Sequence, residues 1–187
     1  MSPQKSYAPP PREERRGLLI VNTGNGKGKT TAALGMLLRS AGHDLKVGMF
    51  QFIKSLGSVT NGEHVAAARL GITITPLGDG FTWLSENIAE DRALAEQGWK
   101  TCRAAITSGE YDVIILDELT YPLTFGWLDI DAVIQELQDR PAGTHIIATG
   151  RNAPQQLIDA ADLATEMHMV KHPFREKGIG AQAGIEL

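Results

Sequence analysis

The sequence predicts an α/β fold in which helices cover both faces of a mostly parallel β-sheet. Two observations predict it. Short apolar runs with β-branched residues alternate along the chain with longer helix-like stretches, and a glycine-rich loop joins the first run to the first stretch. Strands separated by helices pair in parallel through right-handed crossovers. Ligands of such sheets bind beyond the carboxyl ends of the strands, so the loop after each strand is a candidate for the binding site.

The first half of the chain opens with the apolar run 18–21, which is typical of a strand buried on both faces. A helix is expected over 29–41, with Gly42 as a suitable stop. Its expected packing face consists of Ala32, Ala33, Leu34, Leu37 and Leu38. The next expected elements are a strand at 47–53, a helix at 63–70 and a strand at 72–75. Glycine or proline lies at the end of most of them.

The second half begins with a long expected helix at 86–108, which Gly109 ends. The most apolar strand follows at 113–116. The remaining expected elements are a helix at 129–138, a strand at 145–149, a short helix at 154–160 and a weaker strand at 163–170. The glycine-rich end, 177–187, is expected to be irregular.

The organisation predicted is one domain over 17–187, preceded by a flexible tail. Residues 1–16 hold four prolines, mixed charge and almost nothing apolar. Such a segment buries too little surface to offset the entropy lost on ordering.

Composition narrows the classes of function. The net charge of −4 argues against a general nucleic-acid binder, which usually has a basic surplus. No apolar run is long enough for a membrane span, and the first residues lack the apolar stretch of a signal peptide. Cys102 is the single cysteine, so an internal disulfide and a cysteine-based metal cluster are excluded. These features predict a cytoplasmic protein with a small-molecule partner.

A phosphate-binding loop lies between the first strand and the first helix. Gly28-Lys29-Thr30 fits the end of the Walker A pattern G-x-x-x-x-G-K-[ST], although Thr23 stands at its leading glycine. Small residues let backbone N–H groups turn inward around phosphate oxygens, and the helix that starts at Lys29 adds its positive end. The loop therefore predicts ATP binding and a P-loop NTPase-like fold.

The strand at 113–116 ends in two carboxylates, Asp117 and Glu118. An apolar strand with this ending is the usual Walker B partner of a phosphate loop. The pair is expected beside the loop, where it can bind Mg²⁺ directly or through water.

Several weaker candidates follow other strands or sit on the first helix. Phe81 and Trp83, on a loop flanked by glycine, form either an apolar platform for a ligand or anchors in the core. Arg151, Lys54 and Arg39 are placed either to reach a phosphate or ligand carboxylate, or to form surface salt bridges.

Taken in order, these motifs resemble the ATP:corrinoid (cob(I)alamin) adenosyltransferases of the P-loop type. The resemblance covers the chain from Gly17 onward, and Thr23 at the leading position is usual in that family. The blocks that carry it are Thr23 to Ala33, Gln51 to Lys54, Asn61 to Glu63, Gly80 to Trp83, Leu116 to Tyr121, Thr149 to Arg151, Val170 to Phe174 and Gly184 to Glu186.

The resemblance implies an activity. The family transfers the 5′-deoxyadenosyl group of ATP to the Co(I) centre of a reduced corrinoid and releases tripolyphosphate, in adenosylcobalamin synthesis or salvage. It further implies a homodimer, Mg²⁺ or Mn²⁺, and an electron-donating reductase as partner.

The resemblance also implies roles for single residues. Lys29 would neutralise the leaving tripolyphosphate, and Phe81 and Trp83 would pack under the corrin. Thr30, Asp117 and Glu118 would hold the metal ion. The nucleotide-binding set is Thr23, Gly24, Asn25, Gly26, Lys27, Gly28, Lys29, Thr30 and Thr31, with Arg39, Lys54 and Arg151 as further candidates.

Two alternatives share the same motifs. An ordinary P-loop ATPase or kinase would transfer the γ-phosphoryl group of ATP, with Glu118 positioning the nucleophile. A nucleotide-dependent corrinoid-binding module would bind ATP without turnover.

Overall fold

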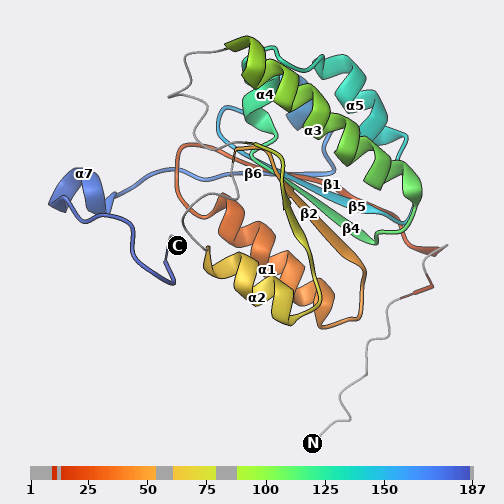
Figure 1. Cartoon of the computed structure of the whole chain (residues 1–187), viewed down its shortest axis with the longest axis horizontal. Helices are drawn as coiled ribbons and strands as arrows, with labels where there is room; N and C mark the ends of the chain where they lie inside the picture. Colours follow the sequence, from red (N-terminus) through yellow and green to blue (C-terminus); the bar gives the residue numbers. More distant parts are fainter. Residues whose placement is uncertain (1–9, 12–13, 54–60, 79–87, 186–187) are drawn as a thin grey trace, which may run out of the picture.

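A computed structural model describes residues 10–11, 14–53, 61–78 and 88–185. Its described residues form a six-stranded sheet, in which every neighbouring pair is parallel, between two layers of helices (Figure 1). The order across the sheet is β3-β2-β4-β5-β1-β6. The strands are β1 Leu19–Thr23, β2 Val47–Gln51, β3 Ile74–Pro76, β4 Val113–Asp117, β5 His145–Thr149 and β6 Leu163–Glu166. The predicted P-loop α/β architecture is confirmed.

The helices divide between the two faces. Helices α1 (Lys29–Ala41) and α2 (Gly62–Arg69) pack on one face, where Ala33, Leu37 and Ala67 meet strand residues in a buried cluster. The other face is covered by α3, α4, α5 and α6, whose buried residues join a larger cluster. Their bounds are α3 Ile88–Ser108, α4 Thr120–Thr124, α5 Ile130–Gln138 and α6 Gln155–Ala160.

The strand sequences read as continuously apolar because both faces of the sheet are covered. On β4 the side chain of Leu116 enters the cluster under α3 and α5, and that of Ile115 enters the cluster under α1. Cys102 of α3 is fully buried in the larger cluster, and this burial raises the pKa of its thiol. Cys102 therefore contributes to the packing of the core.

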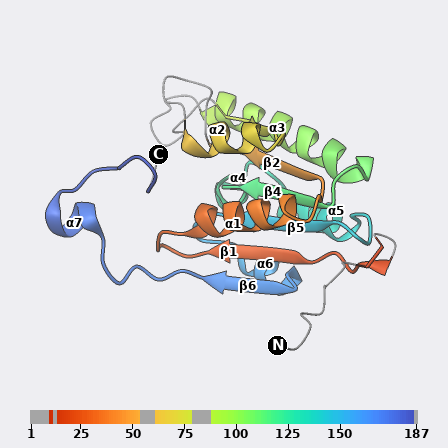
Figure 2. The same cartoon turned by 90° about the horizontal axis from the view of Figure 1, so that it is seen from below.

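Figure 2 shows β6 at the outer edge of the sheet, with the chain after it running away from the globule toward α7 (Pro173–Lys177). No residue of α7 is buried, and all four residues of β6 are exposed. Within the described part of the chain, none of the helices combines the length and apolar character that crossing a bilayer requires.

The structure corrects several expected boundaries. The last strand ends at Glu166, not at 170, and β2 ends at Gln51. The third strand begins at Ile74 because the N–H of Ile72 still bonds the Ala67 carbonyl at the end of α2. Two short helices, α4 and α7, were not predicted. Each has five residues including a proline, which is too short a stretch to show a helical period.

Candidate active site

The phosphate loop connects β1 to α1 and closes around its own lysine. Lys29 is only 7% exposed, and its Nζ donates to the carbonyl oxygens of Gly24 at 2.8 Å and Gly26 at 2.7 Å. Gly28, just before the helix, has φ 112°, a left-handed conformation that residues with a Cβ rarely adopt. The sequence thus places a cation inside a small-residue loop at the start of a thirteen-residue helix.

Two opposing effects set the pKa of Lys29. Burial lowers it, while the nearby charges of Glu118 and Asp117 raise it. The Arg151 guanidinium also lowers it, which places Arg151 within electrostatic reach of the loop. An anion bound here would relieve the cost of burying the ammonium group.

The end of β6 forms the other side of the loop. The N–H of Gly26 donates to the carbonyl oxygen of Met167 at 2.6 Å. A Cβ added to Gly26 would lie 2.7 Å from that oxygen. The loop therefore needs glycine at this position for close backbone approach.

A row of buried polar side chains crosses the carboxyl edge of the sheet beneath α1. The register pairs Gln51 of β2 with Asp117 of β4, and Asn22 of β1 with Thr149 of β5. The four side chains are at most 3% exposed. Parallel strands bring their ends to one edge, so residues far apart in sequence become neighbours here.

Asp117 is the centre of this row. Its Oδ1 accepts hydrogen bonds from Thr149 Oγ1 at 2.7 Å and Thr30 Oγ1 at 2.9 Å. Its Oδ2 accepts one from Gln51 Nε2 at 3.1 Å. Gln51 Oε1 lies 2.7 Å from His64 Nε2 of α2, and because a carbonyl oxygen only accepts, His64 carries the proton on that nitrogen. Three donors thus fix the orientation of the Asp117 carboxylate.

Glu118 turns the chain sharply away from the sheet. Its φ of 64° lies in the left-handed region, which costs a residue with a side chain about 1 kcal/mol. Its N–H donates to Thr149 Oγ1 at 3.0 Å, and this bond holds the turn. Its charge raises the pKa of Lys29. Burial raises the pKa of Tyr121, and the charge of Glu118 raises it further. Uncommon backbone conformations of this kind gather at functional sites.

The oxygen atoms gathered here suit Mg²⁺. The Thr30 hydroxyl lies 2.9 Å from the Asp117 carboxylate, and Mg²⁺ prefers hard oxygen ligands. The described residues contain no group of three or more His, Cys, Asp or Glu side chains that could hold a metal ion. A magnesium ion would therefore take its other ligands from phosphate and water, as it commonly does.

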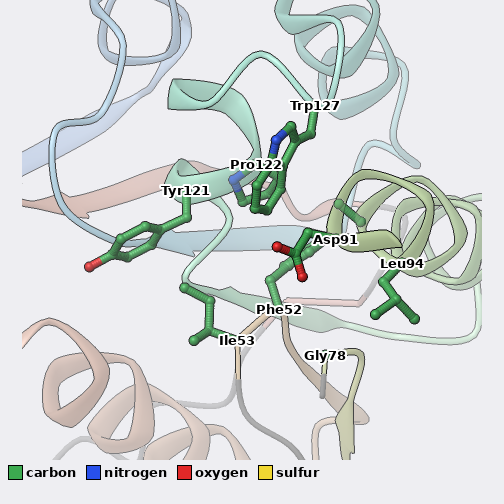
Figure 3. Close-up of a pocket in the computed structure, with 9 residues that line it drawn as sticks. Phe52, Ile53, Gly78, Asp91, Leu94, Tyr121, Pro122 and Trp127 are labelled. Atoms are coloured by element: carbon green, nitrogen blue, oxygen red, sulfur yellow. The ribbon is translucent and has the colours of Figure 1, made fainter. Parts of the chain in front are cut away.

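A small apolar pocket with a cavity volume of about 10 Å³ opens at the same edge, beyond β2 and β3 (Figure 3). It is aromatic on two sides and contains one carboxylate, that of Asp91. The lining residues are Phe52, Ile53, Gly78, Asp91, Leu94, Ala95, Tyr121, Pro122 and Trp127.

The predicted site residues fall into three groups. The loop from Thr23 to Thr31, Asp117 and Glu118 meet at the carboxyl edge, and Arg151 follows β5 there. The structure does not bring Arg39 to this edge, because it lies in the last turn of α1, about 15 Å along the helix from Lys29 at 1.5 Å per residue. Lys54, Phe81 and Trp83 lie outside the described residues.

Sequence reasoning did not identify Asn22, Thr149, Gln51, His64 or Asp91 as site residues. Three of them, Asn22, Gln51 and Thr149, are polar residues in the last or penultimate position of mostly apolar strands. That pattern could have indicated them, because a polar side chain at the end of a buried strand faces the ligand edge.

Comparison with known proteins gives consistent results. Residues 15–187 match the family described as ATP:corrinoid adenosyltransferase BtuR/CobO/CobP. A corrinoid adenosyltransferase of Pseudomonas aeruginosa is 42% identical over 175 residues, which cover 92% of this chain and 85% of that protein. One from Escherichia coli K12 is 39% identical over 174 residues, covering 93% and 87%.

A solved structure shares the fold at low identity. The flagellar accessory protein FlaH from Methanocaldococcus jannaschii superposes with a TM-score of 0.51 and 13% identity, over 80% of this chain and 70% of that one. At this identity the likeness concerns the fold alone.

Proposed function

The chain belongs to the ATP:corrinoid adenosyltransferase family, and from this premise we propose that it transfers the 5′-deoxyadenosyl group of ATP to the Co(I) centre of a reduced corrinoid, with release of tripolyphosphate. The observation that carries the proposal is the pairing of two different sites at one sheet edge. Lys29 and Thr30 lie beside Asp117, and an apolar, aromatic pocket lies beyond the neighbouring strands. The first suits a polyphosphate, and the second offers aliphatic and aromatic contacts at the edge where a macrocycle would bind.

The protein's own residues bind and orient the nucleotide. Backbone N–H groups from Gly24 to Thr31 surround the triphosphate, and the Lys29 ammonium turns from the loop carbonyls to the phosphate oxygens. Thr30, Asp117 and Glu118 hold Mg²⁺, or Mn²⁺, with Gln51 and Thr149 fixing the Asp117 carboxylate. The ion, when bound, supplies positive charge that offsets the charge of the polyphosphate. Arg151 adds a further cation within electrostatic reach of Lys29.

The reaction balances without a protein base. The electron pair of Co(I) forms the Co–C bond to the ribose C5′, the C5′–O bond breaks, and its electrons leave on tripolyphosphate. Cobalt ends formally as Co(III), and no proton moves. Catalysis then rests on holding Co and C5′ in line and on neutralising the leaving group. Phe81 and Trp83 pack against the corrin in this proposal.

The proposed assembly is a homodimer that uses the exposed edge. An edge strand with free hydrogen-bonding groups is normally covered or paired. Five large apolar side chains on β6 and the described chain after it are exposed, namely Leu163, Val170, Phe174, Ile179 and Ile185. We expect light scattering to give the molar mass of two chains for the wild type. In the double variant Val170→Glu, Phe174→Glu, the molar mass should fall toward that of one chain. A wild-type chain that is monomeric at micromolar concentration would contradict this assembly.

The remaining partners follow from the chemistry. Co(I) is strongly reducing, so an electron-donating reductase must supply it. One cysteine, buried as Cys102, fits the reducing cytoplasm, where we place the protein.

The test is an anaerobic reaction with ATP, Mg²⁺ and chemically reduced cobalamin. We expect a light-sensitive Co–C product and tripolyphosphate in equal amounts. ADP as the nucleotide product would favour a P-loop ATPase or kinase. Binding of both ligands without any product would favour a binding module.

A further inference from the structure

Asp91, in the first turn of α3, is the one carboxylate that lines the apolar pocket. Its side chain is 9% exposed, although aspartate is rarely buried unless paired. Figure 3 shows its oxygens pointing into the space between the Trp127 ring and Phe52. The carboxylate thus faces a pocket whose other walls are aliphatic or aromatic.

Nothing among the described residues pairs with this carboxylate. It makes no hydrogen bond and no ion pair to them, and the neighbouring Arg92 binds Glu96 instead. Leaving a carboxylate unpaired in apolar surroundings is unfavourable. Since no described residue supplies a donor to the Asp91 carboxylate, a bound ligand can supply one.

The position of the pocket identifies the ligand, given the proposed function. Two lining residues, Gly78 and Asp91, flank in the sequence the segment that contains Phe81 and Trp83. Tyr121, on a third wall, follows the Asp117–Glu118 pair by three residues. The pocket's cavity volume of about 10 Å³ holds about one water-sized group, so a macrocycle stays outside and only the NH₂ end of one of its side chains fits.

We infer that Asp91 accepts a hydrogen bond from a primary carboxamide on the corrin periphery and disfavours a carboxylate at that position. This inference rests on the proposed corrinoid substrate. An ionised carboxylate only accepts hydrogen bonds, so it matches the N–H₂ of an amide. A ligand carboxylate would instead meet a like charge in an apolar site, which is strongly unfavourable. Asp91 therefore selects corrinoids that are already amidated at the docked side chain.

The test compares two corrinoids that differ only in carboxamide or carboxylate on the periphery. For the wild type we expect Kd and kcat/KM to favour the amide by at least about 10-fold, since hydrogen bonds to a charged group discriminate at this level. In Asp91→Asn, which keeps the shape and removes the charge, we expect the preference to shrink severalfold, chiefly through tighter binding of the carboxylate. Asp131→Asn, at an exposed first-turn aspartate of α5, should keep the wild-type preference.

Binding is measured by fluorescence quenching with the Co(III) corrinoids and no ATP, so the result does not depend on turnover. An Asp91→Asn variant that keeps the full preference would overturn the inference, as would a wild type without preference. Asp91→Ala serves if the first variant fails to fold, with the same expected loss of preference. If the wild type binds amidated corrinoids with this preference but forms no Co–C product, the proposed adenosyl transfer is wrong and the role of Asp91 is supported. If the wild type binds no corrinoid, both the proposed function and the role of Asp91 are wrong.

Discussion

The Thr149 hydroxyl donates a 2.7 Å hydrogen bond to Asp117 Oδ1 and so joins the end of β5 to the end of β4. The hydroxyl oxygen of Thr149 also accepts a 3.0 Å hydrogen bond from the N–H of Glu118. One buried side chain therefore orients the carboxylate and holds the left-handed turn after it. The positions of Asp117 and Glu118 in the candidate metal site are therefore set by how β4 and β5 pair in the sheet.

Replacing Thr149 with valine tests the link. Valine has nearly the same shape but neither donates nor accepts, so the buried Asp117 carboxylate and the part-buried N–H of Glu118 each lose a partner. We expect a loss of about 1–3 kcal/mol in the free energy of unfolding, measured by denaturant titration. Mn²⁺ binding to the ATP complex, followed by electron paramagnetic resonance, should also weaken. Thr149→Ser keeps the hydroxyl and should retain most of the stability and most of the Mn²⁺ affinity. Equal behaviour of the valine and serine variants would contradict the role of the Thr149 hydroxyl.

A second prediction concerns Lys29 in the phosphate loop. Lys29→Met keeps the length of the side chain and removes the ammonium, which we propose neutralises the leaving tripolyphosphate. We expect the rate of adenosyl transfer to fall by about 10²–10³, as for loss of one strong stabilising donor. Lys46→Met removes an equally charged but exposed lysine, whose nearest carboxylate, Glu110, is 4.0 Å away, and should retain the wild-type rate. A Lys29→Met enzyme within a few-fold of the wild type would remove Lys29 from the mechanism.

Local sequence signals were sufficient for the loop and the Walker B pair. A glycine-rich turn between an apolar strand and a helix is a local pattern, and α1 begins and ends at the residues expected. The network around Asp117 is different, because it depends on the order β2-β4-β5-β1 across the sheet. His64 and Gln51 lie far from Asp117 in sequence, and no periodicity reveals that α2 places His64 Nε2 2.7 Å from Gln51.

Irregular segments were also beyond local prediction. Helix α4 contains Pro122 and is held partly by tertiary contacts, since Thr120 Oγ1 donates to the carbonyl oxygen of Arg151 at 2.6 Å. The strand expected through 170 stops at Glu166, and the next residue, Met167, bonds through its carbonyl to Gly26 of the phosphate loop. In both cases contacts between distant residues override the local pattern.

A third prediction uses two glycines close in sequence. In Gly26→Ala the new Cβ would lie 2.7 Å from the Met167 carbonyl oxygen, so the loop would have to move and lose its 2.6 Å bond. We expect a lower melting temperature and at least about 10-fold weaker ATP binding, the cost of about 1.4 kcal/mol, measured by calorimetry. Gly35→Ala, on an exposed helical position with no atom within 4 Å of the new Cβ, should stabilise by about 0.5–1 kcal/mol. Unchanged ATP affinity in Gly26→Ala would show that the loop tolerates the shift.

The last prediction concerns pH and His145, at the start of β5. Its Nδ1 accepts a hydrogen bond of 3.1 Å from the N–H of Leu18, which requires the neutral ring. Burial lowers the pKa of His145, the charges of Arg140 and Arg15 lower it further, and Asp112 opposes them. In the unfolded chain the pKa returns to about 6.5. Between that value and the lower pKa of the folded state, the unfolded chain binds the proton and the folded protein does not.

Stability from this group is therefore complete above about pH 6.5 and is lost as the pH falls through the pKa of the folded state. We expect the melting temperature of the wild type to decline from pH 7 to pH 5. In His145→Asn, where the side-chain oxygen can accept from Leu18 without titrating, the decline should be smaller. Asp162, whose pKa is lowered by the hydrogen bond from the Leu19 N–H, titrates below this window and so leaves the comparison intact. Parallel pH profiles for the two proteins would show that another group causes the decline.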